Sequence, residues 1–443
     1  MKSKKRSINV KSKLLALLIG VSLILALVAV PLMSGCAPKV PEAPEVPEVP
    51  GAFGDPIKFA MCDPMTGPHA VTGMGRHMAV QLLTEAINDK GGLVVDGVHH
   101  LIDHRMYDNV SWNPFDEKKA YEKMILKDGV GFSISTWTSA TTKAVAELCQ
   151  ENKHLRIAWG GGWLNPDYPY IMSEESGGPL YYIGGIQAVT DAHPELKRVA
   201  WLLSDNTPNL SAKPWIEIGC RALGLEVVYD KIHPDDTVDY MPVMSAVVAT
   251  NPDLIIMGCA TAWQAAAVEA AMVLGYKGAW LCESLYPRIY DKEVWDYFGS
   301  LDTYSLYGNY VVKNEFVPDI VYEVYTSYEA AYPGQWDACM SEVVQAALFW
   351  KYAVETAGST DPTVVMNTLY AMPEVDHPVF GKSGWGGEDI HGCSHWLITP
   401  VGVNKIIDGV ETIVAMPSIL DFLNKYSDLV HEVLDREGLL YQP

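Results

Sequence analysis

The stretch that decides the predicted fold is GVGFSISTWTSATTKAVAELCQE, residues Gly129–Glu151. It begins with an apolar segment, Val130–Ser135, that has the composition of a short buried strand. A hydroxyl-rich turn, Thr136–Thr142, follows this strand. Four small or apolar residues then recur at helical spacing and predict a helix on which they share one face: Ala140, Ala144, Val145 and Leu148.

The turn between this strand and helix has two interpretations. A strand that runs into a helix N-terminus leaves free backbone N–H groups and a partial positive charge, which suit a small anionic group of a ligand. In an ordinary connection, by contrast, Thr138 or Ser139 merely caps the helix. The segment alone leaves both interpretations open, and the rest of the chain decides between them.

Strands and helices alternate in two successive series along the chain. The first series runs from Ile57–Cys62 to Arg156–Gly160, and the second runs from Arg198–Leu203 to Tyr304–Val311. Such alternation predicts parallel sheets that are covered on both faces. The predicted fold class is therefore α/β, with two doubly wound parallel-sheet lobes and a ligand cleft between them at the carboxyl ends of the strands.

The sequence also predicts two helices outside the opening stretch, each with its own buried face. In Gly75–Lys90 the face consists of Met78, Leu82, Ala86 and Ile87. The tail, Pro417–Leu440, has the pattern of one amphipathic helix with an apolar face formed by Leu420, Leu423, Leu429, Val433 and Leu439.

Length and charge limit the classes of function. A chain of 443 residues is too long for one typical domain, so two or three lobes are expected. The formal net charge of −22 repels nucleic acid and anionic membranes, so neither is expected as a partner. The cysteines of the body are odd in number and scattered, which is no disulfide framework, although one bridge is possible. Four of them lie in or beside apolar runs and are expected to be buried: Cys62, Cys149, Cys259 and Cys282.

The N-terminus predicts where the protein is located. A basic segment, Met1–Lys13, precedes an apolar run, Leu14–Met33, and then Ser34-Gly35-Cys36. Small residues before a lone cysteine resemble a bacterial lipobox, so residues 1–36 are predicted to be a lipoprotein signal peptide with lipidation at Cys36. An uncleaved membrane anchor is the competing view. Residues 37–54 begin with repeated Pro-Glu-Val and form a semi-rigid tether, which places the body outside the cytoplasm on a bacterial membrane, in the periplasm or on the outer surface.

Several segments in order resemble one family. They are IKFAMCDPMTGP from Ile57, the helix end Ala86–Gly92, the turn STWTSATTKAVAEL, Asn251–Gly258 ahead of an alanine-rich helix, and Ala357–Pro362. Together they resemble the leucine/isoleucine/valine-binding family of ABC-transporter substrate-binding proteins, which have the type I periplasmic binding fold. The resemblance implies three chain crossings between lobes, near Gly185, Val311 and Gly392. The N-terminal lobe would then contain 55–185 and 312–392, and the C-terminal lobe 186–311 and 393–443.

The same resemblance implies candidate ligand-binding residues. The family's amino-acid binders hold the ligand carboxylate with the hydroxyl turn, here Thr138 and Ser139, and the α-amino group with a carboxylate that matches Glu283. The chain departs from that pattern at Gly160–Gly162, where a hydroxyl residue is usual, and at Thr72 and Asn209, where an aromatic residue is common. The predicted ligand-binding set is Trp137, Thr138, Ser139, Gly161, Trp163, Asn209, Thr261 and Glu283.

Four tryptophans lie at or near strand carboxyl ends and are candidates for ligand walls: Trp137, Trp159, Trp163 and Trp263. At least two of them are expected to be ordinary core or surface aromatics. A hydroxyl turn, a glycine loop and aromatic walls would suit an amino-acid-like solute, an amide, or an organic or aromatic acid.

The predicted function is an extracytoplasmic solute-binding lipoprotein of an ABC importer that captures such a solute by hinge closure. Its expected partners are the ligand, the permease subunits and the lipid on Cys36. The alternative is a ligand-sensing receptor module that signals to a partner protein. No cofactor, no metal and no enzymatic activity are expected, because the spacing of His391, Cys393 and His395 matches no common zinc site and Glu283 has no catalytic partner at recognisable spacing.

Overall fold

The structure is a computed structural model that describes residues 53–442 except 136–137, 160–161, 259–261 and 286–289. The predicted signal peptide 1–36, with Cys36, and nearly all of the predicted tether 37–54 lie outside these residues. Trp137, Gly161 and Thr261, three of the predicted ligand-binding residues, also lie outside them. Their roles stay predictions.

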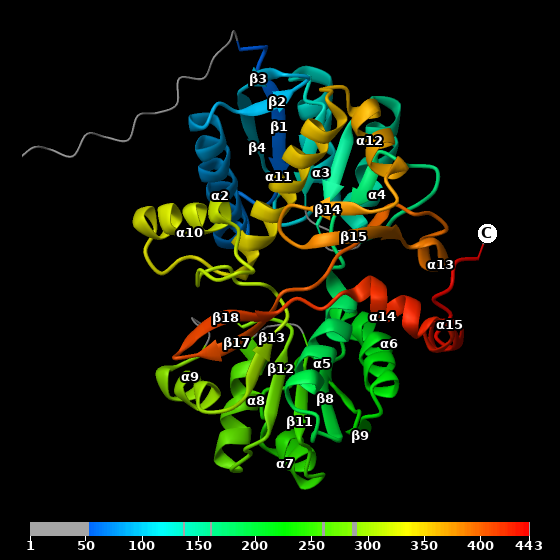
Figure 1. Ribbon diagram of the computed structural model, residues 1–443. Coiled ribbons are helices and arrows are strands. Elements are labelled where there is room, and N and C mark those ends of the chain that lie inside the picture. The colour runs from blue at the N-terminus through cyan, green and yellow to red at the C-terminus, as the bar shows by residue number, and fades with distance from the viewer. Residues whose placement is uncertain (1–52, 136–137, 160–161, 259–261, 286–289, 443) are drawn as a thin grey trace, which may run out of the picture. The chain divides into compact units, whose positions relative to one another are not determined.

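The first of two large sheets has eight strands in the order β14-β15-β16-β7-β6-β5-β1-β4 (Figure 1). The run from β16 to β4 is parallel throughout, whereas β15 and β14 extend the sheet antiparallel. The strands are β1 (Ile57–Cys62), β4 (Ile102–Tyr107), β5 (Phe132–Ser135), β6 (Leu155–Ala158), β7 (Ile171–Ser173), β14 (Val375–His377), β15 (Gly381–Gly386) and β16 (Trp396–Ile398). A separate hairpin is formed by β2 (Leu93–Val95) and β3 (Val98–His100).

The second sheet has the order β10-β8-β11-β12-β13-β17-β18, and β9 pairs with β8 beside this path. It is parallel as far as β13, and β17 and β18 close it as an antiparallel hairpin. The strands are β8 (Arg198–Ser204), β9 (Glu226–Tyr229), β10 (Ile232–His233), β11 (Leu254–Met257), β12 (Ala279–Cys282), β13 (Thr303–Ser305), β17 (Val403–Ile407) and β18 (Val410–Ala415). Two parallel-dominated sheets confirm the predicted α/β fold class.

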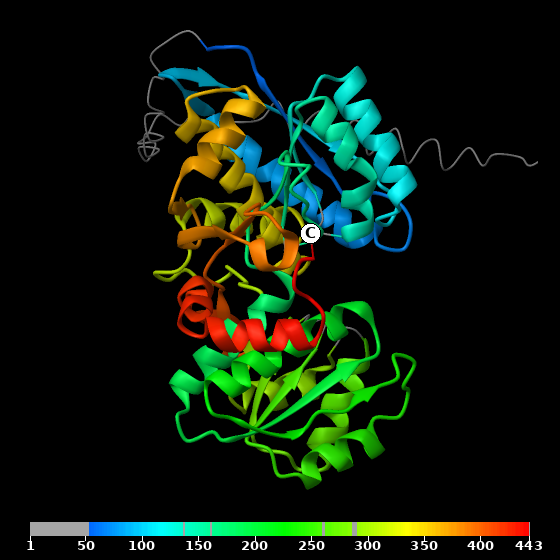
Figure 2. The same cartoon turned by 90° about the vertical axis from the view of Figure 1, so that its right-hand side faces the viewer.

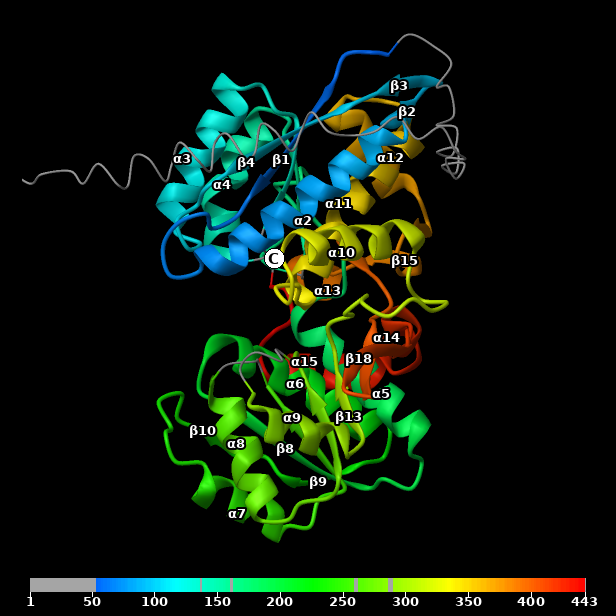
Figure 3. The ribbon, with the colours of Figure 1, turned by 90° about the vertical axis from the view of Figure 1, so that its left-hand side faces the viewer.

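Helices cover both faces of the first sheet. Consecutive residues of β1 separate the two layers, because Phe59 and Met61 join a core with α2, α10 and α11 while Ala60 and Cys62 join a core with α3 and α4. Figures 2 and 3 show these helices on opposite sides of the sheet. Their bounds are α2 (Ala70–Asp89), α3 (Pro114–Glu122), which continues as a π-helical turn to Lys127, α4 (Ser139–Glu151), α10 (Asp319–Ala331), α11 (Ala338–Ala357), α12 (Pro362–Ala371) and α13 (Glu388–His391).

The second sheet is covered in the same way. In β8, Ala200 and Leu202 pack with α7, α8 and α9, whereas Trp201 and Leu203 pack with α5, α6 and the C-terminal helices. The helices are α5 (Tyr181–Ala192), α6 (Thr207–Ala222), α7 (Met241–Ala249), α8 (Ala262–Val273), α9 (Lys292–Gly299), α14 (Ile419–Lys425) and α15 (Ser427–Arg436). Cover on both faces explains why β11, LIIM, is apolar at every position.

The buried faces of two predicted helices are shifted from the predicted ones. In α2 the buried residues include Arg76, Ala79, Val80, Leu83 and Ile87, so Met78 and Leu82 lie at its margin. In α4 the buried face is formed by Thr141, Thr142, Val145, Ala146 and Cys149, and Ala140 is exposed. In these helices small and polar residues also belong to the buried face. A pattern of apolar residues alone therefore does not predict that face.

The predicted tail helix is two helices. The chain leaves the helical path at Tyr426, with α14 before it and α15 after it. Val433 is buried as predicted, whereas Leu439 lies beyond α15 and is 42% exposed. Within the described residues no helix is long and apolar enough to cross a bilayer.

Three segments carry the chain between the two sheets. The first follows β7 and leads to α5, the second, residues 306–318, follows β13, and the third, residues 399–402, joins β16 to β17. The first and third are tied by Ser176, whose N–H donates to Oγ1 of Thr399 at 3.0 Å and whose hydroxyl donates to the Thr399 carbonyl at 2.5 Å. The three segments that carry the chain between the sheets are the crossing segments.

The predicted crossing at Val311 falls inside the second crossing segment, but the other two positions differ. Helix α5 contains Gly185 and packs on the second sheet so closely that a Cβ there would lie 3.0 Å from Cδ1 of Leu281 on β12. Strand β16 lies beyond Gly392 and still belongs to the first sheet. The first crossing therefore lies before Gly185, and the third lies after Gly392. The full extents of the two lobes stay a prediction.

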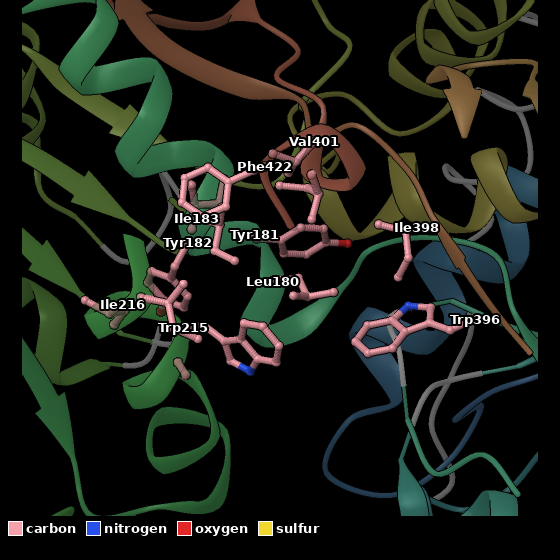
Figure 4. Packing of buried hydrophobic residues seen from close by; sticks show 14 of the residues in the cluster. Leu180, Tyr181, Tyr182, Ile183, Trp215, Ile216, Trp396, Ile398, Val401 and Phe422 are labelled. Atoms are coloured by element: carbon pink, nitrogen blue, oxygen red, sulfur yellow. The ribbon is translucent and has the colours of Figure 1, made fainter. Parts of the chain in front are cut away.

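Apolar side chains fill the space beside the first and third crossing segments. Figure 4 shows Leu180 and Tyr181, at the start of α5, among Trp215, Trp396 and Val401, and all of these belong to one buried cluster. The indole Nε1 of Trp396 donates to the Glu175 carbonyl at 2.6 Å. The crossing segments are thus packed and hydrogen-bonded, and they are not loose linkers.

Candidate functional site

In open parallel sheets, ligands bind at the carboxyl ends of the strands. In the first sheet these ends lead into Asp63 after β1, Thr138 after β5 and Trp159 after β6. In the second they lead into Asp205 after β8, Gly258 after β11 and Glu283 after β12. The candidate site is built from these loops and the helix starts that follow them.

The hydroxyl turn of the opening stretch is a helix cap. Thr138 is the N-cap of α4, with extended backbone at φ −60° and ψ 127°, and its Oγ1 accepts from the Thr141 N–H at 3.4 Å. Its carbonyl accepts from Oγ1 of Thr142 at 2.9 Å. Thr138 is half-buried and Ser139 is exposed. The capping interpretation is confirmed, and contact of Thr138 or Ser139 with a ligand stays a prediction.

A buried arginine dominates the carboxyl edge of the first sheet. Arg76 lies on α2 and is 6% exposed. Its Nη1 lies 3.2 Å from Oδ2 of Asp63, and its Nη2 lies 3.3 Å from Oε2 of Glu342 on α11. Its guanidinium lies 5.4 Å from the ring centroid of Trp159 and 6.0 Å from that of Trp112. The result is a cation between two carboxylates and two indoles.

Trp112 reaches this group from a strained turn. Three consecutive residues, Val110, Ser111 and Trp112, have φ of 49°, 61° and 58°, a left-handed conformation that costs free energy for residues other than glycine. Oδ1 of Asn109 holds the turn by accepting from the Trp112 N–H at 3.2 Å. The indole Nε1 then donates to Oδ1 of Asp63 at 2.8 Å. Strain of this kind is found at functional sites, and it marks the 110–112 turn as part of the candidate site.

Sequence reasoning missed both Arg76 and Trp112. An arginine in the first turn of the predicted helix, Gly75–Lys90, looks like part of its solvated face, and Trp112 lies in a loop without a recognisable motif. The available signal for Arg76 was its position one helical turn before Val80, two before Leu83 and three before Ile87, which places it on an apolar face.

Glu283 lies where the family resemblance placed it, at the carboxyl end of β12. It is 8% exposed, and two phenols hold its carboxylate. Tyr182 donates to Oε2 at 3.1 Å, and Tyr307 donates to Oε1 at 2.9 Å. Protein donors therefore satisfy this buried carboxylate, which would otherwise be costly to bury. Its role toward a ligand stays a prediction.

Asn209, in the first turn of α6, stabilises the loop that follows β8. It is fully buried, and its Nδ2 donates to Oδ1 of Asn206 at 2.7 Å and to Oγ of Ser204 at 3.1 Å. A Cβ on Gly258 would lie 1.5 Å from Oδ1 of Asn209, so the two loops approach closely here. Beside them Gln264 donates to the Gly258 carbonyl at 2.6 Å. These contacts fix the loops after β8 and β11, and a ligand contact of Asn209 stays a prediction.

Two of the four tryptophans are core residues, as expected. Trp159 is 1% exposed, and Trp263 is 7% exposed and stacks on Tyr240 with ring centroids 5.7 Å apart. Trp163 is half-buried, lies 5.7 Å from the ring of Tyr168 and has the Lys143 ammonium over it. Among the described tryptophans of this group, Trp163 is therefore the one whose side chain is partly exposed.

Buried acids gather behind the Arg76 group. Burial raises the pKa of the Glu342 carboxyl well above its usual range, although Arg76 lowers it, and the charges of Glu175 and Glu283 raise it further. Burial raises the pKa of Glu175 to about 7, and a hydrogen bond from Tyr181 lowers it. The charge of Glu283, from the second sheet, thus acts on Glu342, whose helix covers the first. Acidic groups associated with the two sheets therefore interact electrostatically.

This topology and this placement of charged groups define a class of proteins. Members of the class hold a small solute between two α/β lobes that the chain crosses three times. No group of three or more His, Cys, Asp or Glu residues within the described ranges is arranged to hold a metal ion.

The chain belongs to the periplasmic binding protein family, whose sequence profile matches residues 56–404. The match confirms the resemblance to the leucine/isoleucine/valine-binding type that the motifs predicted. It begins one residue before β1 and ends in β17, so it includes all three crossing segments.

Solved structures share this fold. A solute-binding protein of an ABC transporter from Rhodopseudomonas palustris, in complex with p-hydroxybenzoic acid, is 19% identical with a TM-score of 0.60, over 82% of this chain and 96% of that one. An amino acid ABC transporter substrate-binding protein from Pseudomonas fluorescens is 14% identical with a TM-score of 0.62, over 83% and 97%. A leucine-binding protein from Thermotoga maritima is 19% identical with a TM-score of 0.58, over 82% and 99%.

Proposed function

We propose that this protein is the extracytoplasmic solute-binding lipoprotein of an ABC importer and captures a small organic solute by closure of two lobes. The observation that carries the proposal is a buried charged group at the carboxyl edge of each sheet: Arg76 with Asp63 and Glu342 on the first, and Glu283 with its two tyrosines on the second. A solute that contacts both groups favours the conformation in which both reach it.

The charged groups indicate the class of solute. Arg76, between Trp112 and Trp159, suits a carboxylate on a flat or apolar body, and Glu283 suits an amine, amide or hydroxyl donor. We therefore propose an amino-acid-like solute, an amide, or an organic or aromatic acid. The similar structures that bind p-hydroxybenzoic acid and leucine support this range.

A thermal-shift screen of amino acids, amides, short organic acids and aromatic acids tests the solute class. A ligand present at a hundred times its dissociation constant adds about 2.7 kcal/mol to the free energy of unfolding, which such a screen detects. The ligand that responds is then titrated against Thr138→Ala, Ser139→Ala and Glu283→Gln. We expect at least one of them to weaken binding tenfold or more. If none does, the proposed site is wrong.

Attachment to the membrane is a separate part of the proposal. We propose that Cys36 becomes the lipidated first residue and that residues 37–54 hold the body away from the bilayer. Labelling of cells with palmitate is expected to mark the wild-type protein and not Cys36→Ser. An unlabelled wild-type protein would exclude lipidation and leave the solute-binding proposal standing.

A further inference from the structure

A fully buried ion pair lies beneath the carboxyl edge of the first sheet. Glu117 on α3 and Arg156 on β6 are both 0% exposed, and Nη2 of Arg156 lies 3.7 Å from Oε1 of Glu117. The Ser135 hydroxyl donates to the same Oε1 at 2.9 Å, and Nε of Arg156 donates to the Tyr121 hydroxyl at 3.0 Å. A buried pair adds little net stability, because the loss of hydration costs about as much as the attraction returns. The stability of the fold alone therefore does not account for this pair.

One contact of Arg156 leads to the hydroxyl turn. Nη1 of Arg156 donates to Oγ1 of Thr142 at 3.1 Å, and the Thr142 hydroxyl donates to the Thr138 carbonyl at 2.9 Å. Thr142 lies in the first turn of α4 and is 1% exposed, and Thr138 is the N-cap of the same helix. Arg156 is therefore joined to the start of α4 through the hydroxyl group of Thr142.

The contacts of Glu117 lead to the Trp112 turn. Oε2 of Glu117 accepts from Nδ2 of Asn109 at 2.6 Å, and Oδ1 of Asn109 accepts from the Trp112 N–H at 3.2 Å. Because a carboxylate only accepts hydrogen bonds, it fixes which end of the Asn109 amide faces Trp112. Burial raises the pKa of Glu117, whereas Arg156 and the hydrogen bonds from Asn109 and Ser135 lower it. The neighbours of Glu117 thus favour the ionised form that orients Asn109, against the cost of burial.

The two sets of contacts meet at the Arg76 group. The indole of Trp112 donates to Asp63, and Asp63 pairs with Arg76. The loops involved follow β5, β1 and β4, which are adjacent strands of the sheet. Polar contacts therefore run without a break from Thr138, through the buried pair, to Arg76. In a low-dielectric interior such a hydrogen-bonded network is rigid.

We propose that Glu117 and Arg156 are positioning residues of the solute site, which fix the hydroxyl turn and the Trp112 turn relative to each other. Both side chains are 0% exposed and do not reach a solute, so they act through Asn109 and Thr142. Turns that are held in place before the solute arrives reduce the free energy spent on ordering them when it binds. This proposal rests on the proposed function, because the two turns matter to a solute only if it binds beside them.

The indole N–H of Trp112 reports on this network in the full chain in detergent, with no solute present. Its resonance is identified by comparing isotope-labelled wild type with Trp112→Phe. Thr142→Val removes the hydroxyl between Arg156 and the turn, and Glu117→Gln removes the charge that orients Asn109. In both variants we expect the Trp112 indole N–H to exchange with solvent about tenfold faster than in the wild type. Unchanged exchange in either variant would overturn the proposal.

Thr141→Val is the matched control. Thr141 is 0% exposed and its hydroxyl donates to the same Thr138 carbonyl at 3.0 Å, but among the described residues the hydroxyl that accepts from Arg156 on this turn is that of Thr142. Both threonine variants are expected to lose a similar free energy of unfolding in urea, whereas only Thr142→Val should accelerate exchange at Trp112. Equal acceleration in the two variants would mean that the turn acts on Trp112 through helix capping alone, and it would overturn the role of Arg156.

Failure of this proposal and failure of the proposed function are distinguishable. No solute enters the exchange measurement, so unaffected exchange at Trp112 contradicts the positioning role and leaves solute binding standing. If no solute responds in the thermal-shift screen, the proposed function fails, and the exchange measurement still decides whether Glu117 and Arg156 hold the two turns together.

Discussion

At the residue scale, Arg76 shows how distant parts of the chain form one group. Its two carboxylate partners lie 13 and 266 positions away in the sequence, at Asp63 and Glu342. No spacing rule joins residues so far apart, so the contact of Arg76 with these two carboxylates could not be predicted from the sequence. Thr138 was predicted as a helix cap from a local pattern, whereas Glu283 was predicted from the family resemblance.

Removal of the Arg76 guanidinium is expected to be costly. In Arg76→Met, Asp63 and Glu342 stay buried without their cation, and loss of one partner from a buried ion pair destabilises by about 3–5 kcal/mol. Guanidinium chloride unfolding of the variant and the wild type measures the difference. Arg436→Met is the control, since Arg436 pairs with Glu217 at the surface and its side chain is 48% exposed. Equal losses in both variants would contradict a special role for Arg76.

Thr138 allows capping and binding to be separated. Thr138→Ala removes the oxygen that accepts from the Thr141 N–H, so we expect a loss of about 1 kcal/mol in unfolding free energy. Asp361→Ala removes the equivalent cap of α12, where Oδ1 accepts from the Thr363 N–H at 2.7 Å, and should cost a similar amount. If Thr138 also contacts the solute, only Thr138→Ala will weaken solute binding. Unchanged stability in Thr138→Ala would contradict the cap.

At the element scale, the strands were predicted better than the helices. Ile57–Cys62 is a short apolar run with the predicted bounds, and β8 ends one residue beyond the predicted strand Arg198–Leu203. The faces of α2 and α4 were shifted because Arg76 and Thr141 are buried, and polar residues in a helix look exposed to a sequence pattern. No proline or glycine lies beside Tyr426, so the sequence does not predict the break of the tail helix there.

Strand β18 carries a buried carboxyl that makes stability depend on pH. Oε1 of Glu411 accepts from Ser305 at 2.6 Å, and Oε2 accepts from Asn309 at 3.2 Å. Burial outweighs these hydrogen bonds and raises its pKa to about 7 from 4.5. Between these values the folded protein keeps the proton that the unfolded chain releases, so stability falls as the pH rises through this window.

The effect of Glu411 is isolated by comparison with Glu411→Gln, which keeps the shape and cannot ionise. The wild type is expected to lose about 3 kcal/mol relative to the variant as the pH rises from about 4.5 to 7. Urea unfolding at half-unit pH intervals measures the difference, and other titrating groups cancel in it. A difference that is independent of pH, or that grows in favour of the wild type, would contradict the raised pKa.

At the scale of the whole molecule, alternation of strands and helices was enough to predict two sheets, because the parallel strands of each series pair within one sheet. The crossing segments were predicted from family resemblance and only in part. Their hydrogen bonds join Ser176 to Thr399, and Asn309 to Asn404 at 3.1 Å, across breaks in the sequence that no local pattern spans.

Thr399→Val is expected to loosen this connection. The change removes the Oγ1 that accepts from the Ser176 N–H and leaves that donor buried and unpaired, which costs about 1–3 kcal/mol. Because the lost bond lies between crossing segments, amide hydrogen exchange should become faster at residues 174–177 and 399–402, while strands such as β5 and β11 keep their protection. Thr412→Val, at a half-buried position of β18, should change neither. Exchange that accelerates equally in the core strands would show that the bond stabilises the fold as a whole and does not specifically join the two lobes.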